Sequence, residues 1–391
     1  MSTLKVDAIR HNSATSDAIT TAADGTCTAK ITSVGGGQLS HRNKARNGAM
    51  KISQRGTTFS PTTTKTYLLD GWQTNHGSSG NLDTTVTHSD DAPDGFSKSL
   101  KITPDSTLTP SASQNGLIAQ YLEGQDFQDL AFGTSDAKPI TVSWYAKTSA
   151  TGAGNYTVKV EYRDASNNNY AVNKLFAFTT TWTRFTYTIP ATGTATTNSM
   201  VDDNTRGLRV EFHLFAGPDD VASQFTQWTL NPTPTFKVIS GQKNFMDNTN
   251  NELYITGLQI EVGDTATSFE HRSYADELRH CQRYYVQFGN GYNTGARGGS
   301  GGSLALYNYH LPVPLRTSPS FSTNPGSLTG FSVRAYKYNG FTDSTNAPSL
   351  ATNGYTTNSS FAYVQQSGHS IDDDRVSAIQ QSGTIALIAE M

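Results

Sequence analysis

Aromatic side chains cluster around a predicted hairpin near the end of the chain. They are Tyr336, Tyr338, Phe341 and Tyr355. An aromatic ring at a loop tip can stack on the apolar C–H face of a sugar, while a tyrosine hydroxyl stays hydrated. These residues are therefore the first candidates for a ligand site, and carbohydrate is the ligand class that they favour. The same side chains would serve equally well in a domain core or in an interface between copies of the chain.

The tryptophans raise the same hypothesis. They are Trp72, Trp144, Trp182 and Trp228. We expect Trp144 and Trp182 in a core, because each lies inside or at the start of a segment with alternating apolar residues. Trp72 and Trp228 stay undecided between core and surface, and Trp72 joins the candidate ligand-binding residues.

Acidic pairs in predicted loops offer oxygen ligands to a hard cation, and they could hold a structural Ca²⁺. These pairs are Asp90-Asp91, Asp202-Asp203 and Asp219-Asp220. None has the spacing of an EF-hand. A further polar cluster consists of His369 and Asp372–Asp374. Solvated turns are the ordinary state of such residues, so we predict no metal site and no cofactor.

No residue pattern in the sequence singles out a catalytic site. Glycoside hydrolysis needs two carboxyl groups a few ångströms apart, whereas Glu123, Asp126 and Asp129 have the spacing of an ordinary acidic edge at the surface. The sequence contains no H-E-x-x-H motif and no Gly-rich phosphate loop. Cys27 and Cys281 lie outside any C-x-x-C or Cys/His ligand spacing, so a disulfide framework is not expected. We predict a protein that is not an enzyme and has no catalytic residues.

The composition limits the class of protein. A chain of 391 residues has room for two or three domains. Charged residues make up only 16%, against about 25% in an ordinary domain. The net charge of −3 gives no electrostatic footprint for nucleic acid. No apolar run approaches the roughly 20 residues of a membrane span, and the first residues lack the apolar stretch of a signal peptide. We therefore expect no nucleic-acid binding, no membrane insertion, and synthesis in a cytoplasm.

The elements that must position these residues are strands. Residues 1–44 contain short β-like pieces and few apolar residues, so we expect an extended anchor that becomes ordered by pairing with copies of itself or with another protein. The alternative is a flexible tail without a role of its own. Residues 45–272 contain many short strands separated by turn signals, which predicts a jelly-roll β-sandwich. Its last strand includes a slip in the apolar alternation at Gly257, which predicts a bulge.

The remaining segments complete an all-β fold. We expect a short linking α-helix over residues 273–288, because Ser273 and Asp276 make a capping box. Tyr274, Leu278, Cys281 and Tyr285 then fall on one helical face. Residues 289–391 form a small C-terminal β-sandwich, in which Asn339-Gly340 is a strong hairpin signal. A domain of this size has little core of its own and favours packing against neighbours.

Several blocks of the chain resemble a known family. The run LQIEVGDTATSFEHRSYADELRHCQRYY (258–285) resembles the signature of bacteriophage tail-fibre and related virion appendage proteins of the marine or cyanophage kind. NGAMKISQRG (47–56), YLLDGW (67–72) and HLPVPLRTSPSF (310–321) resemble further blocks of that family, in the same order. The segments ITVSWYAKTS and TWTRFTYTIP resemble paired strands of a carbohydrate-binding-module type of jelly roll.

The resemblance implies a structural component of a phage virion. It implies a tail fibre that binds host cell-surface polysaccharide through residues 289–391, is a homotrimer, and attaches to other tail or head proteins through residues 1–44. Its location would then be the virion, after synthesis in the host cytoplasm. The alternative is a capsid-decorating or tail scaffold protein without receptor binding.

Overall fold

The computed structural model describes most of the chain. The described residues are 6–10, 12–13, 18–29, 40–61, 64–77, 82–192, 199–230, 238–288, 291–296, 304–317, 319–323, 331–337, 340–344, 361–367, 377–381 and 385–391. Strands dominate, which confirms the predicted all-β class. Within these ranges, α1 (Tyr274–Gln282) is the one α-helix.

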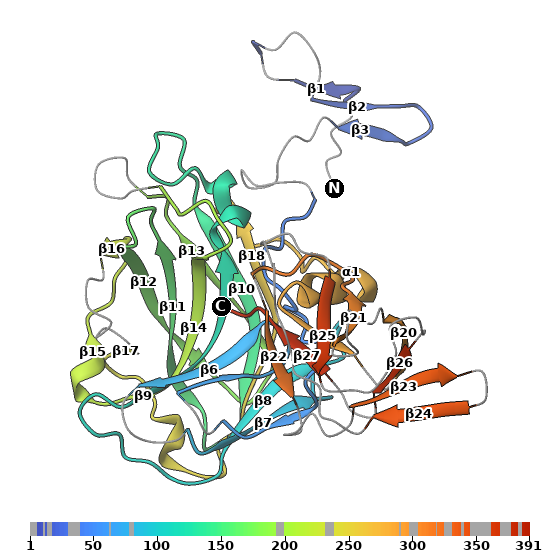
Figure 1. Ribbon diagram of the computed structural model, residues 1–391. Helices are drawn as coiled ribbons and strands as arrows, with labels where there is room; N and C mark the ends of the chain where they lie inside the picture. Colours follow the sequence, from blue (N-terminus) through green and yellow to red (C-terminus); the bar gives the residue numbers. More distant parts are fainter. Residues whose placement is uncertain are drawn as a thin grey trace.

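Two antiparallel sheets pack face to face and form the body of the molecule (Figure 1). The six-stranded sheet has the order β13 (Thr183–Ile189), β10 (Ile140–Thr148), β18 (Leu253–Val262), β8 (Ser99–Pro104), β7 (Thr84–Ser89) and β4 (Thr58–Phe59). The seven-stranded sheet has the order β16 (Thr229–Leu230), β12 (Asn169–Phe178), β11 (Gly154–Arg163), β14 (Arg206–Ala216), β9 (Asn115–Glu123), β6 (Trp72–Gly77) and β5 (Lys65–Tyr67). Alternating apolar side chains bury one face of each sheet, so the predicted β-sandwich is confirmed.

Aromatic rings fill the space between the two sheets. Trp144 of β10 is fully buried and meets Phe176 and Phe212 edge-to-face, at centroid distances of 4.8 and 5.4 Å. Trp72 of β6 lies 6.2 Å from the same Phe212 ring. Such pairs contribute about 0.5–1.5 kcal/mol each beyond the area that they bury. The core position predicted for Trp144 is confirmed.

Strand β18 carries the bulge predicted at Gly257. Its register with β10 slips between Ser143 and Tyr145, and Gly257 has a φ of +64°. A Cβ atom at this position would lie 2.8 Å from the rings of Phe96 and Tyr145. Both the backbone conformation and the close approach therefore require glycine.

A strap on the N-terminal side of the sandwich, residues 40–56, runs along β18. The side chain of Asn43 donates to the carbonyl of Leu258 at 3.2 Å and accepts from the N–H of Ile260 at 3.1 Å. The N–H of Lys44 donates to the carbonyl of Ile260 at 2.8 Å. The packing of the sandwich therefore begins before residue 45.

The first described residues form a separate meander of β1 (Ala8–Ile9), β2 (Ile19–Thr21) and β3 (Cys27–Ala29). Figure 1 shows it set apart from the sandwich. Val6 and Ile9 are 41% and 53% exposed, which is high for apolar side chains. The meander thus has apolar side chains that the described part of this chain does not cover.

Helix α1 begins where the capping box predicts. The N–H of Asp276 donates to the hydroxyl of Ser273 at 3.2 Å. The predicted apolar face is wrong in part, because Tyr274 is 61% exposed while Glu277 is buried beside Cys281. Glu277 faces the sandwich because its carboxylate accepts the N–H of Asn47.

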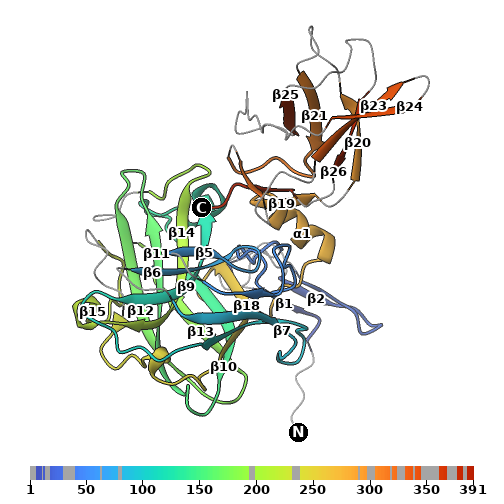
Figure 2. The same ribbon diagram turned by 60° about the horizontal axis from the view of Figure 1, so that its bottom comes forward.

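Three small sheets follow the helix. Their orders are β19 (Tyr285–Phe288), β27 (Ile385–Ile388) and β22 (Ser320–Thr323); β20 (Gly291–Ala296), β26 (Ser377–Gln381), β23 (Phe331–Lys337) and β24 (Gly340–Ser344); and β21 (Leu304–His310) with β25 (Phe361–Ser367). Figures 1 and 2 both show the β20–β26 and β23–β24 strands to one side of the sandwich. The predicted hairpin exists, but Lys337 pairs with Gly340, so the connection lies one residue earlier than Asn339-Gly340.

Short elements join the strands. They are the 3-10 turns η1 (Gly124–Leu130), η2 (Pro218–Asp220) and η3 (Phe245–Asp247), and the parallel pair β15 (Val221–Ala222) and β17 (Val238–Ile239). In the part of the chain that the structure describes, no helix is long and apolar enough to cross a membrane.

Candidate functional site

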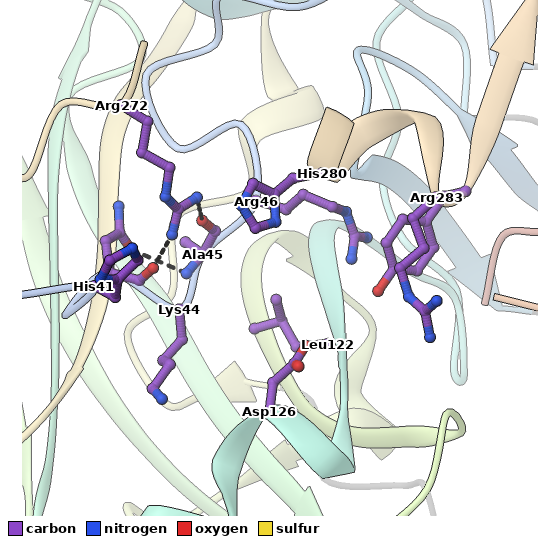
Figure 3. Close-up of a pocket in the computed structure, with 11 residues that line it drawn as sticks. His41, Lys44, Ala45, Arg46, Leu122, Asp126, Arg272, His280 and Arg283 are labelled. Atoms are coloured by element: carbon purple, nitrogen blue, oxygen red, sulfur yellow. Dashed lines mark hydrogen bonds between the residues drawn. The ribbon is translucent and has the colours of Figure 1, made fainter. Parts of the chain in front are cut away.

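Polar side chains from four stretches of the chain meet where helix α1 docks on the sandwich (Figure 3). These stretches are the strap (residues 40–56), the segment where β9 ends and η1 begins, the helix, and the residues that follow it. They include residues of two segments, 47–56 and 258–285. This junction is the candidate functional site.

Glu123, at the end of β9, is the centre of the junction. It is fully buried, and its carboxylate accepts two hydrogen bonds of 2.7 Å from Nε and Nη2 of Arg283. The hydroxyl of Tyr284 donates to the same carboxylate. The hydrogen bond with Glu123 raises the pKa of Arg283, and burial raises the pKa of Tyr284. Glu123 is therefore not the surface acid that its sequence context predicts.

A second carboxylate, that of Glu277, fixes the helix against the strap. It accepts a hydrogen bond of 2.5 Å from the N–H of Asn47 and lies 3.4 Å from Nη1 of Arg272. Arg272 also donates to the carbonyl of Ala45 at 2.9 Å and to the carbonyl of Asn43. One cation thus connects the helix carboxylate to two carbonyls of the strap. Figure 3 shows Arg272 beside Ala45 of the strap.

Asn47 shapes the strap around this carboxylate. It has a φ of +50°, in the left-handed region that asparagine tolerates better than most residues. Its side chain donates to the carbonyls of Ile52 and Asp70, at 2.8 and 2.9 Å, and accepts from the N–H of Ile52 at 2.9 Å. The Asn47 side chain therefore stabilises the local turn through these hydrogen bonds.

Stacked cations complete the junction. The guanidinium of Arg46 lies 3.4 Å from the ring centroid of Tyr284, and that of Arg55 lies 3.7 Å from the ring centroid of Tyr285. A desolvated cation over an aromatic face contributes about 2 kcal/mol. Burial raises the pKa of the Cys281 thiol, which makes it a packing residue rather than a nucleophile. The CQRYY block therefore has a physical role at each of these positions.

A cavity of about 430 Å³ lies between the strap, η1 and the end of α1. Four cations, namely Lys44, Arg46, Arg272 and Arg283, line it together with one carboxylate, that of Asp126. Burial, and then the charge of Glu123, raise the pKa of Asp126. The described side chains that line the cavity offer hydrogen-bond donors and positive charge, but they do not include the pair of carboxylates that glycoside hydrolysis uses. An adjoining cavity of about 450 Å³ shares His41, Arg272 and His280 with it.

A second group of charged residues lies on the face of the seven-stranded sheet that points away from the core. Lys159 pairs with Glu211 at 2.8 Å, and Arg209 pairs with Glu161 at 2.8 Å. Lys159, Glu161 and Glu211 are each only 1% exposed. Although burial alone would raise it, Arg209 and Lys159 hold the pKa of Glu211 well below its ordinary value. Because opposite charges face each other across neighbouring strands, we assign this group a stabilising role.

The structure places the predicted ligand-binding aromatics in different settings. Trp72 is 1% exposed, so its ring is part of the core and the expectation that it binds a ligand is wrong. Tyr336 lies in β23 and Phe341 in β24, and these two residues pair directly across the hairpin. Tyr338 and Tyr355 lie outside the described residues, as do His369 and Asp372–Asp374.

The other tryptophans divide between core and surface. Trp228 is 8% exposed and belongs to the core. Trp182 is only partly buried, against the expectation of a core position, because it precedes β13 rather than lying in its inward register. Its indole N–H donates to Asp91 at 3.1 Å, and its ring lies 6.1 Å from that of Tyr254.

The acidic pairs have ordinary partners. Asp90 pairs with Lys98, and Asp91 pairs with Lys147 at 2.5 Å. Asp220 accepts the side-chain amide of Asn115 at 2.7 Å. Among the residues that the structure describes, no group of three His, Cys, Asp or Glu side chains is placed to hold a metal ion.

Comparison with known proteins finds weak similarity to solved structures. No family model and no curated protein matches the chain. Solved structures that resemble it include the enzymatically active domain of tailspike protein 4 of bacteriophage CBA120, at 10% identity and a TM-score of 0.30, over 56% of this chain and 21% of that chain. The xylan-binding domain CBM22-1 of Xyn10C from Paenibacillus barcinonensis is similar at 13% identity and a TM-score of 0.26, over 54% of this chain and 94% of that one.

A third similar structure is the family 11 carbohydrate-binding module of Lic26A-Cel5E from Clostridium thermocellum. The identity is 9% and the TM-score 0.27, over 55% of this chain and 100% of that one. TM-scores this low do not establish a shared fold, so the β-sandwich is assigned from the two sheets of this chain itself.

Proposed function

We propose that the protein is a non-enzymatic structural component of a phage virion. In this proposal it is a tail fibre that binds host cell-surface glycan through residues 289–391 and is found in the virion after synthesis in the host cytoplasm. It assembles as a homotrimer and attaches to other tail or head proteins through residues 1–44. The sequence resemblance of residues 47–56, 258–285 and 310–321 supports the class of protein.

The docked junction is the observation that carries the proposal. A fibre must hold its distal domain in a fixed direction relative to its shaft, and a free linker would not do so. Here the helix is fixed to the sandwich by Glu123 with Arg283, by Glu277 with Asn47, and by Arg46 over Tyr284. The strands that follow α1 therefore start from a rigid base.

The N-terminal meander supports the attachment role. Its strands are short, and Val6 and Ile9 leave apolar surface exposed in the single chain. Pairing with further copies or with another virion protein would cover that surface. Many weak glycan contacts displayed on one trimer would then act together through effective concentration.

A glycan array probed with the full-length protein tests the receptor-binding part of the proposal. We expect selective binding of a subset of bacterial surface glycans. Uniformly absent signal would contradict receptor binding and favour a capsid-decorating or tail scaffold protein. The matched control is a chain with Tyr336→Ala and Phe341→Ala, which should lose the signal while its far-ultraviolet circular dichroism is kept.

A further inference from the structure

The two adjoining cavities at the junction form one polar groove along helix α1. Their volumes, about 430 and 450 Å³, fall within the range of pockets that bind small molecules. His41, Arg272 and His280 line both cavities, so they lie where the two meet. The groove is therefore large enough for a ligand with one charged group and a polar body.

Positive charge exceeds negative charge in the wall of the first cavity. Lys44 and Arg283 are neutralised by carboxylates behind the wall, Asp129 at 2.9 Å and Glu123 at 2.7 Å. Arg46 differs from them, because within the described residues no carboxylate lies within ion-pair distance of its guanidinium. Arg46 is 6% exposed; its Nη2 donates to the neutral carbonyl of Tyr121 at 3.2 Å, and its guanidinium lies over the ring of Tyr284. Among the described residues, its Nε has no hydrogen-bond partner.

A buried cation without a carboxylate partner favours an anion beside it. Burial and, as the second cause, the charge of Arg272 lower the pKa of His280, which lines both cavities. Figure 3 shows Arg46 and His280 on the α1 side of the cavity, with the carboxylate of Asp126 on the opposite side. The adjoining cavity contains two further carboxylates, and both already accept hydrogen bonds: Glu270 from the N–H of Asn43 and Asp276 from the hydroxyl of Ser273.

We propose that this cavity binds the oxyanion group, a carboxylate or a sulfate, of an acidic saccharide. Arg46 supplies a planar donor group that suits an oxyanion, and His280 supplies a ring N–H. Arg272 is already bonded to Glu277 and to two carbonyls of the strap, so it adds positive charge rather than a free donor. The choice of a saccharide as carrier rests on the proposed glycan-binding function. The inference that an oxyanion binds rests on the charged side chains that line the cavity. The site is separate from the distal residues 289–391, so either could exist without the other.

Isothermal titration of the full-length protein at low salt tests the inference. The probes are trigalacturonate, 3′-sialyllactose and a sulfated galactose disaccharide, with galactotriose as the neutral comparison and sodium sulfate as the free ion. We expect saturable binding of at least one acidic saccharide and none of galactotriose. Arg46→Gln should weaken that binding about tenfold or more, the effect of one charge-assisted hydrogen bond. Lys98→Gln, which changes a side chain that pairs with Asp90 and lines neither cavity, should leave it unchanged.

A second variant keeps the test valid if Arg46→Gln does not fold. His280→Ala changes a side chain near the surface at the helix end, and we expect a several-fold weaker affinity with unchanged circular dichroism. Equal binding of acidic and neutral saccharides, or unchanged affinity in His280→Ala, would overturn the inference. If sodium sulfate binds and no acidic saccharide does, the proposal that the oxyanion belongs to a saccharide would be overturned. Selective binding of neutral glycans on the array, together with no binding of acidic saccharides in these titrations, would contradict this inference and still support the proposed fibre function.

Discussion

The ion pair between Glu123 and Arg283 should dominate the stability of the junction. Glu123→Gln keeps the shape of the side chain and one oxygen that can accept the Tyr284 hydroxyl. It removes the negative charge that accepts the two 2.7 Å hydrogen bonds from Arg283. Hydrogen bonds to charged groups contribute about 1.5–3 kcal/mol each, and breaking a fully buried pair costs about 3–5 kcal/mol. Because the side chain of Arg283 is 31% exposed and regains water, we expect a loss of about 2–3 kcal/mol in the free energy of unfolding.

Urea unfolding followed by tryptophan fluorescence measures this loss, since Trp72 and Trp144 are buried in the sandwich. With an m-value of about 2–3 kcal/mol per molar urea, the midpoint should fall by about 1 M. The matched control is Asp90→Asn, which breaks an ion pair whose carboxylate side chain is 86% exposed, and we expect no measurable shift.

A double-mutant cycle separates the pair from other effects of the substitution. Glu123→Gln combined with Arg283→Gln should cost less than the sum of the two single changes, because the second change removes an interaction that is already lost. If Glu123→Gln shifts the midpoint no more than Asp90→Asn does, the reasoning about the junction is refuted.

Three further predictions concern the sandwich. Trp144→Ala should lower the free energy of unfolding by about 3–5 kcal/mol and Trp182→Ala by much less, in the same urea assay; equal losses would contradict the core and surface assignments. Gly207→Ala should destabilise strongly, since its Cβ would lie 2.2 Å from the Cα atom of Gly124. Gly154→Ala should lower the thermal midpoint by less, because its Cβ would lie 3.0 Å from the Cβ atom of Lys243. Burial lowers the pKa of His88 in the folded protein, whereas the histidine of the unfolded chain has a pKa of about 6.5. Below that pH the folded protein therefore binds fewer protons than the unfolded chain. The free energy of unfolding is complete above about pH 6.5 and falls as the pH drops through the pKa of the folded protein. Urea midpoints at about pH 7.5 and 5.5 should show this fall, and His88→Gln should reduce it.

Much of the sandwich could be predicted from local patterns. The segment 140–147 alternates apolar and polar residues, and it forms β10 with Trp144 turned inward. Gly257 marks the bulge because a slip in the alternation is visible within a single strand. The core position expected for Trp182 is wrong because Trp182 precedes the alternating residues of β13. The alternation therefore does not determine which face of the sheet its side chain takes.

The junction could not be predicted, because its partners are far apart in the sequence. Glu123 and Arg283 are separated by 160 residues, and Asn47 and Glu277 by 230. No periodicity links such positions, and a carboxylate in an acidic stretch is expected at the surface. The one available signal was the set of blocks around residues 47–56 and 258–285. Asn47 in the first block and Glu277 and Arg283 in the second lie on the two sides of one interface.

The solution mass of the protein tests the fibre proposal most directly. Light scattering after size exclusion would be applied to the full-length chain and to a chain lacking residues 1–39, which keeps Asn43 and Lys44 because both hydrogen-bond to β18. We predict three chains for the full-length protein and loss of this assembly in the shortened one. A single chain in both samples would contradict a trimeric fibre that is assembled through its N-terminal segment.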